Sequence, residues 1–119
     1  MKTIVKYIQG LNLEVEFLIG QNKEDNFKII DSSEPEDIWF HASNISSCHI
    51  IASITKTNVK LDKKQLRYIL KQGALLCKQY TNKVAKEKFV EIVYTNVKNV
   101  KKTEVIGTVE TFGTKVLTI

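Results

Sequence analysis

The sequence predicts an α+β fold, in which a single domain carries a largely antiparallel sheet with one long and one short helix. Strand-like segments precede, separate and follow two helical segments, in the order strands, short helix, two strands, long helix, three or four strands. Residues 62–83 repeat apolar side chains at helical spacing, whereas residues 13–19 alternate them at every second position. We therefore expect the long helix to pack on one face of the sheet. The length of 119 residues suits one domain, covering residues 1–119.

The N-terminal part is predicted to form a hairpin followed by the short helix. Residues 3–8 have strand composition, and residues 13–19 place Leu, Val, Phe and Ile on one side. Residues 10–12 (Gly-Leu-Asn) suit the turn between these strands. Asn22 is a favourable N-cap for a helix over residues 23–30, because its side chain can accept a hydrogen bond from the first turn.

Residues 37–42 and 48–54 are predicted to be two further strands, joined by a polar connection. Strand geometry puts alternate residues on opposite faces, with Asp37, Trp39 and His41 on one side. Trp39 could stack on a nucleobase. Its position between Ile38 and Phe40 favours a place in the core instead.

Residues 62–83 are the clearest helix of the chain. Asp62 is a good N-cap, and the basic residues lie off the apolar stripe, so we expect them to face solvent. Gly73 lies inside the helix, where glycine costs about 1 kcal/mol relative to alanine. We therefore expect a close neighbour that needs the space.

The C-terminal part is predicted to complete the sheet. Residues 89–95 have the pattern of a strand, and residues 96–102 are a basic loop or an irregular strand. Residues 107–112 and 115–119 are expected to form a closing hairpin around Gly113.

Positive charge is concentrated in one part of the chain, whose formal net charge is +5. Residues 56–102 carry thirteen Lys or Arg against three acids, whereas residues 1–55 carry four Lys against eight acids. Such a basic block is a candidate polyanion-binding face, although a solvated helix face with basic loops would have the same composition. Because all but one of the eighteen basic residues are Lys, contact with phosphates is favoured over readout of base edges.

Two histidines, two cysteines and one carboxylate are the remaining candidates for chemistry. His41 and His49 could lie close together across a chain reversal and, with Asp37, could perform acid–base chemistry or bind a metal. Their spacing matches no common metal motif, so structural hydrogen bonding and ligand contact stay open as alternatives. Cys48 and Cys77 are expected to be buried thiols. The motifs of phosphate-loop, dinucleotide-binding, serine-hydrolase and zinc-protease sites do not occur.

The sequence has no apolar run of the roughly 18 residues that a membrane helix needs, and its N-terminal segment lacks the pattern of a signal peptide. We therefore expect a cytoplasmic location, with the nucleus possible, and no membrane partner.

Several short motifs together resemble the RNA-binding domain of the NFACT proteins. They are Ile19-Gly20-Gln21-Asn22, Asp25-Asn26, the run EDIWFH over residues 36–41, Ser47-Cys48-His49-Ile50-Ile51, the run VEIVYT over residues 90–95, Val100-Lys101-Lys102, and Gly107 with Val109. Their order and spacing cover nearly the whole chain, and EDIWFH is similar to the short members related to coiled-coil domain-containing protein 25. Two positions depart from the family pattern: Ser47 stands where the family has glycine, and Ile106 where it often has proline. If the glycine allows a phosphate to approach closely, Ser47 would weaken that approach.

The resemblance implies a non-enzymatic nucleic-acid-binding module without a cofactor. Its implied partner is RNA, possibly tRNA or ribosomal RNA in ribosome-associated quality control, with DNA not excluded. We expect two groups of residues to form one cationic surface. These are His41, His49, Lys98, Lys101 and Lys102 as one group, and Lys64, Arg67 and Lys71 as the other. The alternatives are an adaptor that binds protein on the ribosome, and a nuclease or phosphoesterase that uses Asp37, His41 and His49.

Overall fold

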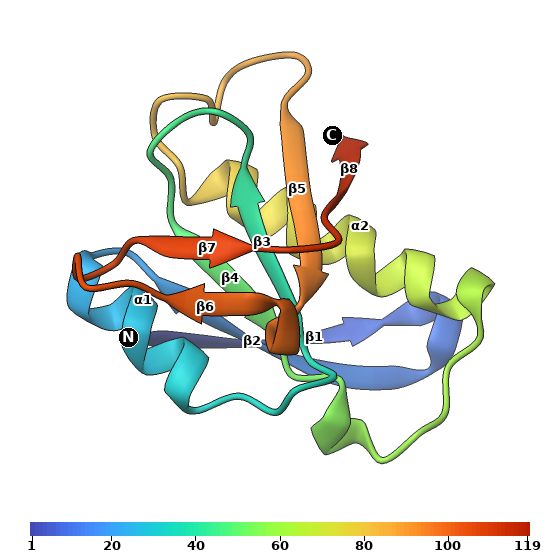
Figure 1. The fold of residues 1–119 in the computed structure, drawn as a ribbon. Coiled ribbons are helices and arrows are strands. Elements are labelled where there is room, and N and C mark those ends of the chain that lie inside the picture. Colours follow the sequence, from blue (N-terminus) through green and yellow to red (C-terminus); the bar gives the residue numbers. More distant parts are fainter.

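A six-stranded antiparallel sheet forms the middle layer of the molecule in the computed structural model, which describes residues 1–119 (Figure 1). Its strand order is β1-β2-β4-β3-β5-β8. The strands are β1 (Lys2–Ile8), β2 (Leu13–Gly20), β4 (His49–Ala52), β3 (Ile38–Ala42), β5 (Glu91–Asn96) and β8 (Lys115–Thr118). A second sheet consists of β6 (Val100–Lys102) and β7 (Val109–Thr111), and the helices are α1 (Lys23–Asp31) and α2 (Lys63–Gln79). This architecture confirms the predicted α+β fold.

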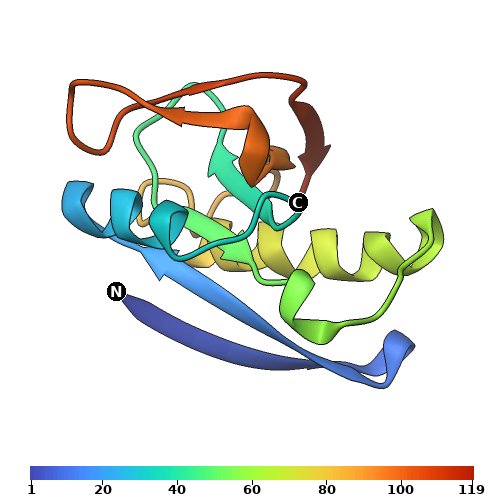
Figure 2. The same ribbon diagram turned by 60° about the horizontal axis from the view of Figure 1, so that its bottom comes forward.

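The two faces of the sheet bury two separate hydrophobic clusters. On one face, Phe17, Phe40 and Ile50 pack with the apolar side of α2. On the other face, Trp39 and Ile51 pack with α1 and with Val100 of β6. Figures 1 and 2 both show β6 and β7 on the side of α1, away from α2. The strand alternation in the sequence therefore predicted correctly which residues share a face.

The long helix begins with a complete capping box. The Asp62 side chain accepts a hydrogen bond from the Gln65 backbone N–H at 2.8 Å, and the Gln65 side chain accepts one from the Asp62 N–H at 3.0 Å. Farther along the helix, a Cβ atom at Gly73 would overlap the ring of Phe40. The expected close neighbour is thus an aromatic side chain of β3.

The predicted C-terminal end of the helix at Lys83 is wrong, because α2 ends at Gln79. Tyr80 caps it, with its backbone N–H bonded to the Leu76 carbonyl. The Thr81 hydroxyl donates to the Cys77 carbonyl at 2.7 Å, and turns follow. Here local hydrogen bonding by a threonine competes with continuation of the helix.

The predicted closing hairpin of residues 107–112 and 115–119 is also wrong. β7 pairs with β6, and β8 pairs with β5, so the chain leaves one sheet and joins the other at Gly113. Val100 and Val109 pack against the cluster around Trp39, which holds the β6–β7 pair on that face. The basic segment 96–102 contains both a 3-10 turn over Val97–Asn99 and the short strand β6.

Cys48 and Cys77 are buried free thiols, as expected from the sequence. Neither helix combines the length and the apolar character that crossing a bilayer requires.

Candidate functional site

The outer side of α2 carries five basic residues, Lys63, Lys64, Arg67, Lys71 and Lys78, which we call the α2 surface. They lie opposite the buried stripe because helical periodicity separates the two sets. The helix contains no Asp or Glu, and none of the four ion pairs of the structure involves it. Its positive charge is therefore not offset by neighbouring carboxylates in the helix.

Two lysines of β1 extend this charge beside the helix. The Lys6 ammonium donates to the Gln72 side chain at 3.2 Å, and the Lys2 ammonium lies 5.1 Å from the centre of the Tyr80 ring. Both sequence-predicted residues Arg67 and Lys71 line a groove of about 350 Å³ between α2 and β8. Arg67 and Lys71 thus share one groove, and Lys64 lies on the same exposed side of the helix.

The lysines near β6 have a different electrostatic environment. Lys98 pairs with Glu36 at 2.8 Å, and Lys102 pairs with Asp31 at 2.5 Å. Lys101 forms no ion pair, although it lies opposite Glu110 in the β6–β7 register. Both pairs are exposed and individually weak, but their carboxylates reduce the local positive potential that a phosphate would meet.

The structure does not bring the two predicted groups of basic residues together. α2 packs on the face that contains Phe40, whereas β6 packs on the face that contains Trp39. The sheet therefore separates Lys64, Arg67 and Lys71 from the lysines of the later segment. The sequence could not reveal this, because the side on which β6 lies depends on long-range packing.

Trp39, His41 and His49 form a compact cluster of three rings. The Trp39 and His41 rings stack with centres 5.5 Å apart and planes 15° apart. His49 meets both rings edge-on, with centres 5.3 Å from Trp39 and 5.0 Å from His41. The strand register explains this arrangement, because β3 and β4 pair Phe40 with Ile50 and so carry the two histidines at the next position.

Hydrogen bonds determine which ring nitrogen of each histidine carries the proton. Trp39 Nε1 donates to His49 Nδ1 at 3.1 Å, so the proton of neutral His49 resides on Nε2. His41 Nδ1 lies 2.7 Å from the Ala42 carbonyl oxygen, which can only accept, so His41 Nδ1 is protonated. Neutral His49 thus has a free Nε2–H donor, and neutral His41 has a free Nε2 acceptor.

Burial keeps both histidines uncharged at neutral pH. Desolvation, reinforced by the nearby His41, lowers the pKa of His49 to about 3. Desolvation also lowers the pKa of His41, partly opposed by its hydrogen bond to Ala42. His49 is only 3% exposed, so it lies in the interior and not beside the lysines on the surface.

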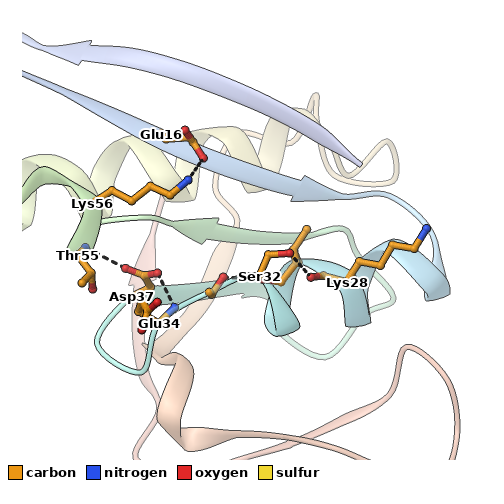
Figure 3. A network of polar contacts seen from close by, with 9 residues as sticks. Glu16, Lys28, Ser32, Glu34, Asp37, Thr55 and Lys56 are labelled. Atoms are coloured by element: carbon orange, nitrogen blue, oxygen red, sulfur yellow. Dashed lines mark hydrogen bonds and ion pairs between the residues drawn. The ribbon is translucent and has the colours of Figure 1, made fainter.

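Asp37 is not part of this ring cluster. Its carboxylate accepts hydrogen bonds from the backbone N–H groups of Glu34 at 2.9 Å and Thr55 at 3.0 Å (Figure 3). It stands before the first residue of β3, whereas His41 lies near the other end, roughly 13 Å along an extended chain. The arrangement of Asp37, His41 and His49 considered for catalysis is therefore not assembled. No three His, Cys, Asp or Glu side chains lie close enough together to hold a metal ion.

A cavity of about 600 Å³ opens beside the ring cluster. Its walls come from the start of α1, the β3–β4 connection and the turn between β6 and β7, and include Lys23, Asn26, His41 and His49. No Asp or Glu lines it. We call this space the ring-cluster cavity.

Asn26 lines this cavity but is not among the site residues predicted from the sequence. It is 8% exposed, and its Oδ1 atom is buried without a hydrogen-bond partner. Gly20 leaves room for it, since a Cβ atom there would overlap Asn26 Oδ1. The motifs that contain Gly20 and Asn26 could have indicated this residue, but only the folded chain places Asn26 in the same cavity as His41.

The two positions that depart from the family pattern both lie in connections between strands. Ser47 has no left-handed backbone conformation, and its hydroxyl accepts a hydrogen bond from the Ala42 N–H and donates to the Cys48 carbonyl. Serine therefore fits this connection without strain. Ile106 precedes Gly107, whose φ of +81° favours glycine and whose Cβ position would lie 2.8 Å from Lys23 Cα.

The fold and these surfaces define a small α+β module with an unopposed cationic helix on one face and a polar, aromatic cavity on the other. The family model of the NFACT protein RNA binding domain matches residues 7–116. The chain belongs to this family of nucleic-acid-binding modules.

Known relatives agree with this membership. The chain is 34% identical over 100 residues to the coiled-coil domain-containing protein 25 homolog of Dictyostelium discoideum, covering 84% of this chain and 48% of that protein. It is 34% identical over 85 residues to coiled-coil domain-containing protein 25 of Mus musculus, covering 71% of this chain and 40% of that protein. The chain thus spans less than half the length of these relatives.

The fold itself is also found in a solved structure. The C-terminal part of the fibronectin/fibrinogen-binding protein from Streptococcus suis superposes with a TM-score of 0.74 at 20% identity, covering 88% of this chain and 40% of that one. At this identity the likeness concerns the fold alone.

Proposed function

We propose that this chain is a non-catalytic RNA-binding module that holds the phosphate backbone on its α2 surface. The observation that carries the proposal is the row of basic residues on α2, with no carboxylate in the helix and no ion pair. Family membership supports nucleic acid as the ligand class. Within that class we propose structured RNA of the translation machinery in the cytoplasm, such as tRNA or ribosomal RNA, acting in ribosome-associated quality control.

The composition of the surface favours tolerance of RNA sequence. Lys neutralises a phosphate as a point charge, and only Arg67 could form the planar bidentate contacts that read base edges or clamp a phosphate. Each neutralised phosphate releases counterions, so the affinity should fall steeply as salt is added. We expect the later lysines to contribute less, since Glu36 and Asp31 compete with phosphates for Lys98 and Lys102.

Two triple variants with the same charge change test this proposal. The first is Lys64→Gln/Arg67→Gln/Lys71→Gln on α2, and its matched control is Lys98→Gln/Lys101→Gln/Lys102→Gln near β6. Binding of a tRNA is measured by fluorescence anisotropy over a series of salt concentrations. We expect the α2 variant to bind more weakly and its slope of log affinity against log salt to be shallower by about 2 to 3, whereas the control changes little.

The affinities of the two triple variants show which group of basic residues contacts the RNA. A larger loss in the β6 variant would overturn the choice of the α2 surface and favour Lys101 and its neighbours. If the wild-type chain does not bind tRNA, duplex RNA or duplex DNA at low salt, the proposal of a nucleic-acid ligand fails.

A further inference from the structure

The ring-cluster cavity lies on the face opposite α2, so phosphate binding on the α2 surface leaves it unexplained. Its volume of about 600 Å³ falls within the roughly 300–1,000 Å³ of small-molecule sites. We propose that it receives a single unpaired nucleobase of the bound nucleic acid. This inference rests on the proposed function and adds a second, chemically different contact to it.

The charge of the cavity suits a neutral, hydrogen-bonding group. No carboxylate lines it, both of its histidines are uncharged at neutral pH, and Lys23 is its one cationic residue. A nucleobase is planar, uncharged and rich in donors and acceptors. The Lys23 ammonium, at the exposed start of α1, is available to the phosphate that accompanies the base.

The polar groups of the cavity match the edge of a base. Neutral His49 has a free Nε2–H donor, and neutral His41 a free Nε2 acceptor. Asn26 adds an amide, the group that can both donate to and accept from a base edge. Its buried Oδ1 has no partner within the protein, and buried polar atoms without partners are rare in folded proteins. In the free chain this oxygen lies against Gly20, so a base could complete its hydrogen bonding only after the Asn26 side chain turns towards the cavity.

The aromatic groups provide a stacking surface. His41 lines the cavity and stacks on Trp39, which is itself fixed by its hydrogen bond to His49. Unstacked bases in protein complexes pack against aromatic and histidine rings. A base that enters the cavity would extend the existing stack of Trp39 and His41.

A phosphate is a poorer occupant than a base. The N-terminus of α1 borders the cavity, but Asn22 Oδ1 already accepts from the Asp25 N–H, and the first turn carries Glu24 and Asp25. Asp25 also pairs with the N-terminal ammonium group at 2.7 Å. Glu24, which forms no ion pair, would repel an anion at the position where a helix usually attracts one.

The cavity can be reached by a strand that also contacts the α2 side. The β3–β4 connection lines the cavity, and its Cys48 Sγ lies 3.4 Å from Thr81 Oγ1, directly after α2. Figure 1 shows this connection and the segment between α2 and β5 projecting from the same end of the sheet. That segment carries Lys83, Lys86 and Lys88. A single strand can therefore pass from the cavity to the C-terminal end of α2, where Lys78 lies.

Trp39 is the only tryptophan and reports on the cavity directly. The experiment compares an eight-nucleotide single-stranded RNA of adenines with a blunt RNA duplex of eight base pairs, following Trp39 fluorescence and anisotropy of the labelled RNA. We expect the single strand to change Trp39 fluorescence and the blunt duplex to leave it unchanged. Asn26→Ala should weaken binding of the single strand about tenfold and leave duplex binding unaltered.

Controls keep the two proposals distinguishable. The α2 triple variant should weaken both RNAs, and Asn26→Asp, which keeps the shape but adds a carboxylate, should weaken the single strand more than Asn26→Ala does. Far-ultraviolet circular dichroism checks that each variant is folded. If both RNAs bind but Asn26→Ala and Asn26→Asp change neither affinity, the cavity does not take a base, while the phosphate surface stands. If neither RNA binds the wild-type chain, both proposals fall.

Discussion

His49 shows how one buried side chain can couple folding to pH. Its pKa of about 3 in the folded chain lies below the value near 6.5 of an exposed histidine. Between these values the unfolded state binds the additional proton, so the free energy of unfolding decreases as the pH falls from about 6.5 towards 3. At neutral pH His49 is largely uncharged in both the folded and the unfolded state, so this loss of stability is nearly absent there.

We predict that His49→Gln reduces the acid sensitivity of the fold. Glutamine can still accept a hydrogen bond from Trp39 but does not titrate. Between pH 7 and pH 5, His49 should account for about 2 kcal/mol of lost stability in the wild-type chain. Urea unfolding at both pH values, followed by circular dichroism, measures the difference. An equal loss in the variant and in the wild-type chain would contradict the low pKa.

The contact between Gly73 and the Phe40 ring limits which side chain can occupy position 73. Gly73→Ala adds helix propensity of about 1 kcal/mol, but the new methyl group overlaps the Phe40 ring. Because overpacking a core typically costs about 1–3 kcal/mol, we expect a net loss of stability. In a Phe40→Leu background the same substitution should cost less, and urea unfolding of the four chains checks this coupling. A gain in stability in the wild-type background would refute the close contact.

Among the elements, α2 has the most complete local stabilisation. Its capping box joins Asp62 and Gln65 through two hydrogen bonds. Asp62→Ala should therefore lower the free energy of unfolding by about 1 kcal/mol, whereas Asp62→Asn keeps a capping side chain and should change it little. Thermal unfolding distinguishes the two. Because Asp62 is not a phosphate contact in the proposed function, its substitution by asparagine should not weaken RNA binding, and a weakened affinity would argue against the α2 surface.

The pair β6–β7 shows where local sequence patterns stop being sufficient. Residues 107–112 and 115–119 have the composition of a hairpin, yet their strands belong to different sheets. The pairing of β7 with β6 is stabilised by Val100 and Val109, which pack near Trp39. The turn at Gly107, whose backbone lies close to Lys23, also contributes. Such contacts join residues far apart in the chain, so no local window of the sequence contains them.

For the molecule as a whole, the sequence predicted the layers better than the site. Alternation along β2 and β3 and the apolar stripe of α2 are local patterns, and each matches the face that it buries. The resemblance to the NFACT family is likewise carried by short motifs and agrees with the matched family model. The ring-cluster cavity, in contrast, needs Asn26, His41 and Thr108 from three separate segments. Its existence, and the neutral state of its histidines, follow only from the packed structure.

The uneven distribution of charge has a consequence for how the molecule meets a polyanion. The side of α2 carries basic residues without ion pairs, whereas on the opposite face carboxylates such as Asp31 and Glu36 offset the lysines beside them. The domain is therefore an electric dipole. The field of an approaching nucleic acid should rotate the domain before contact, so that α2 faces the nucleic acid. Association would then be fast, because the domain is oriented before contact. Entry of a base into the ring-cluster cavity, on the opposite face, would be a later and separate step.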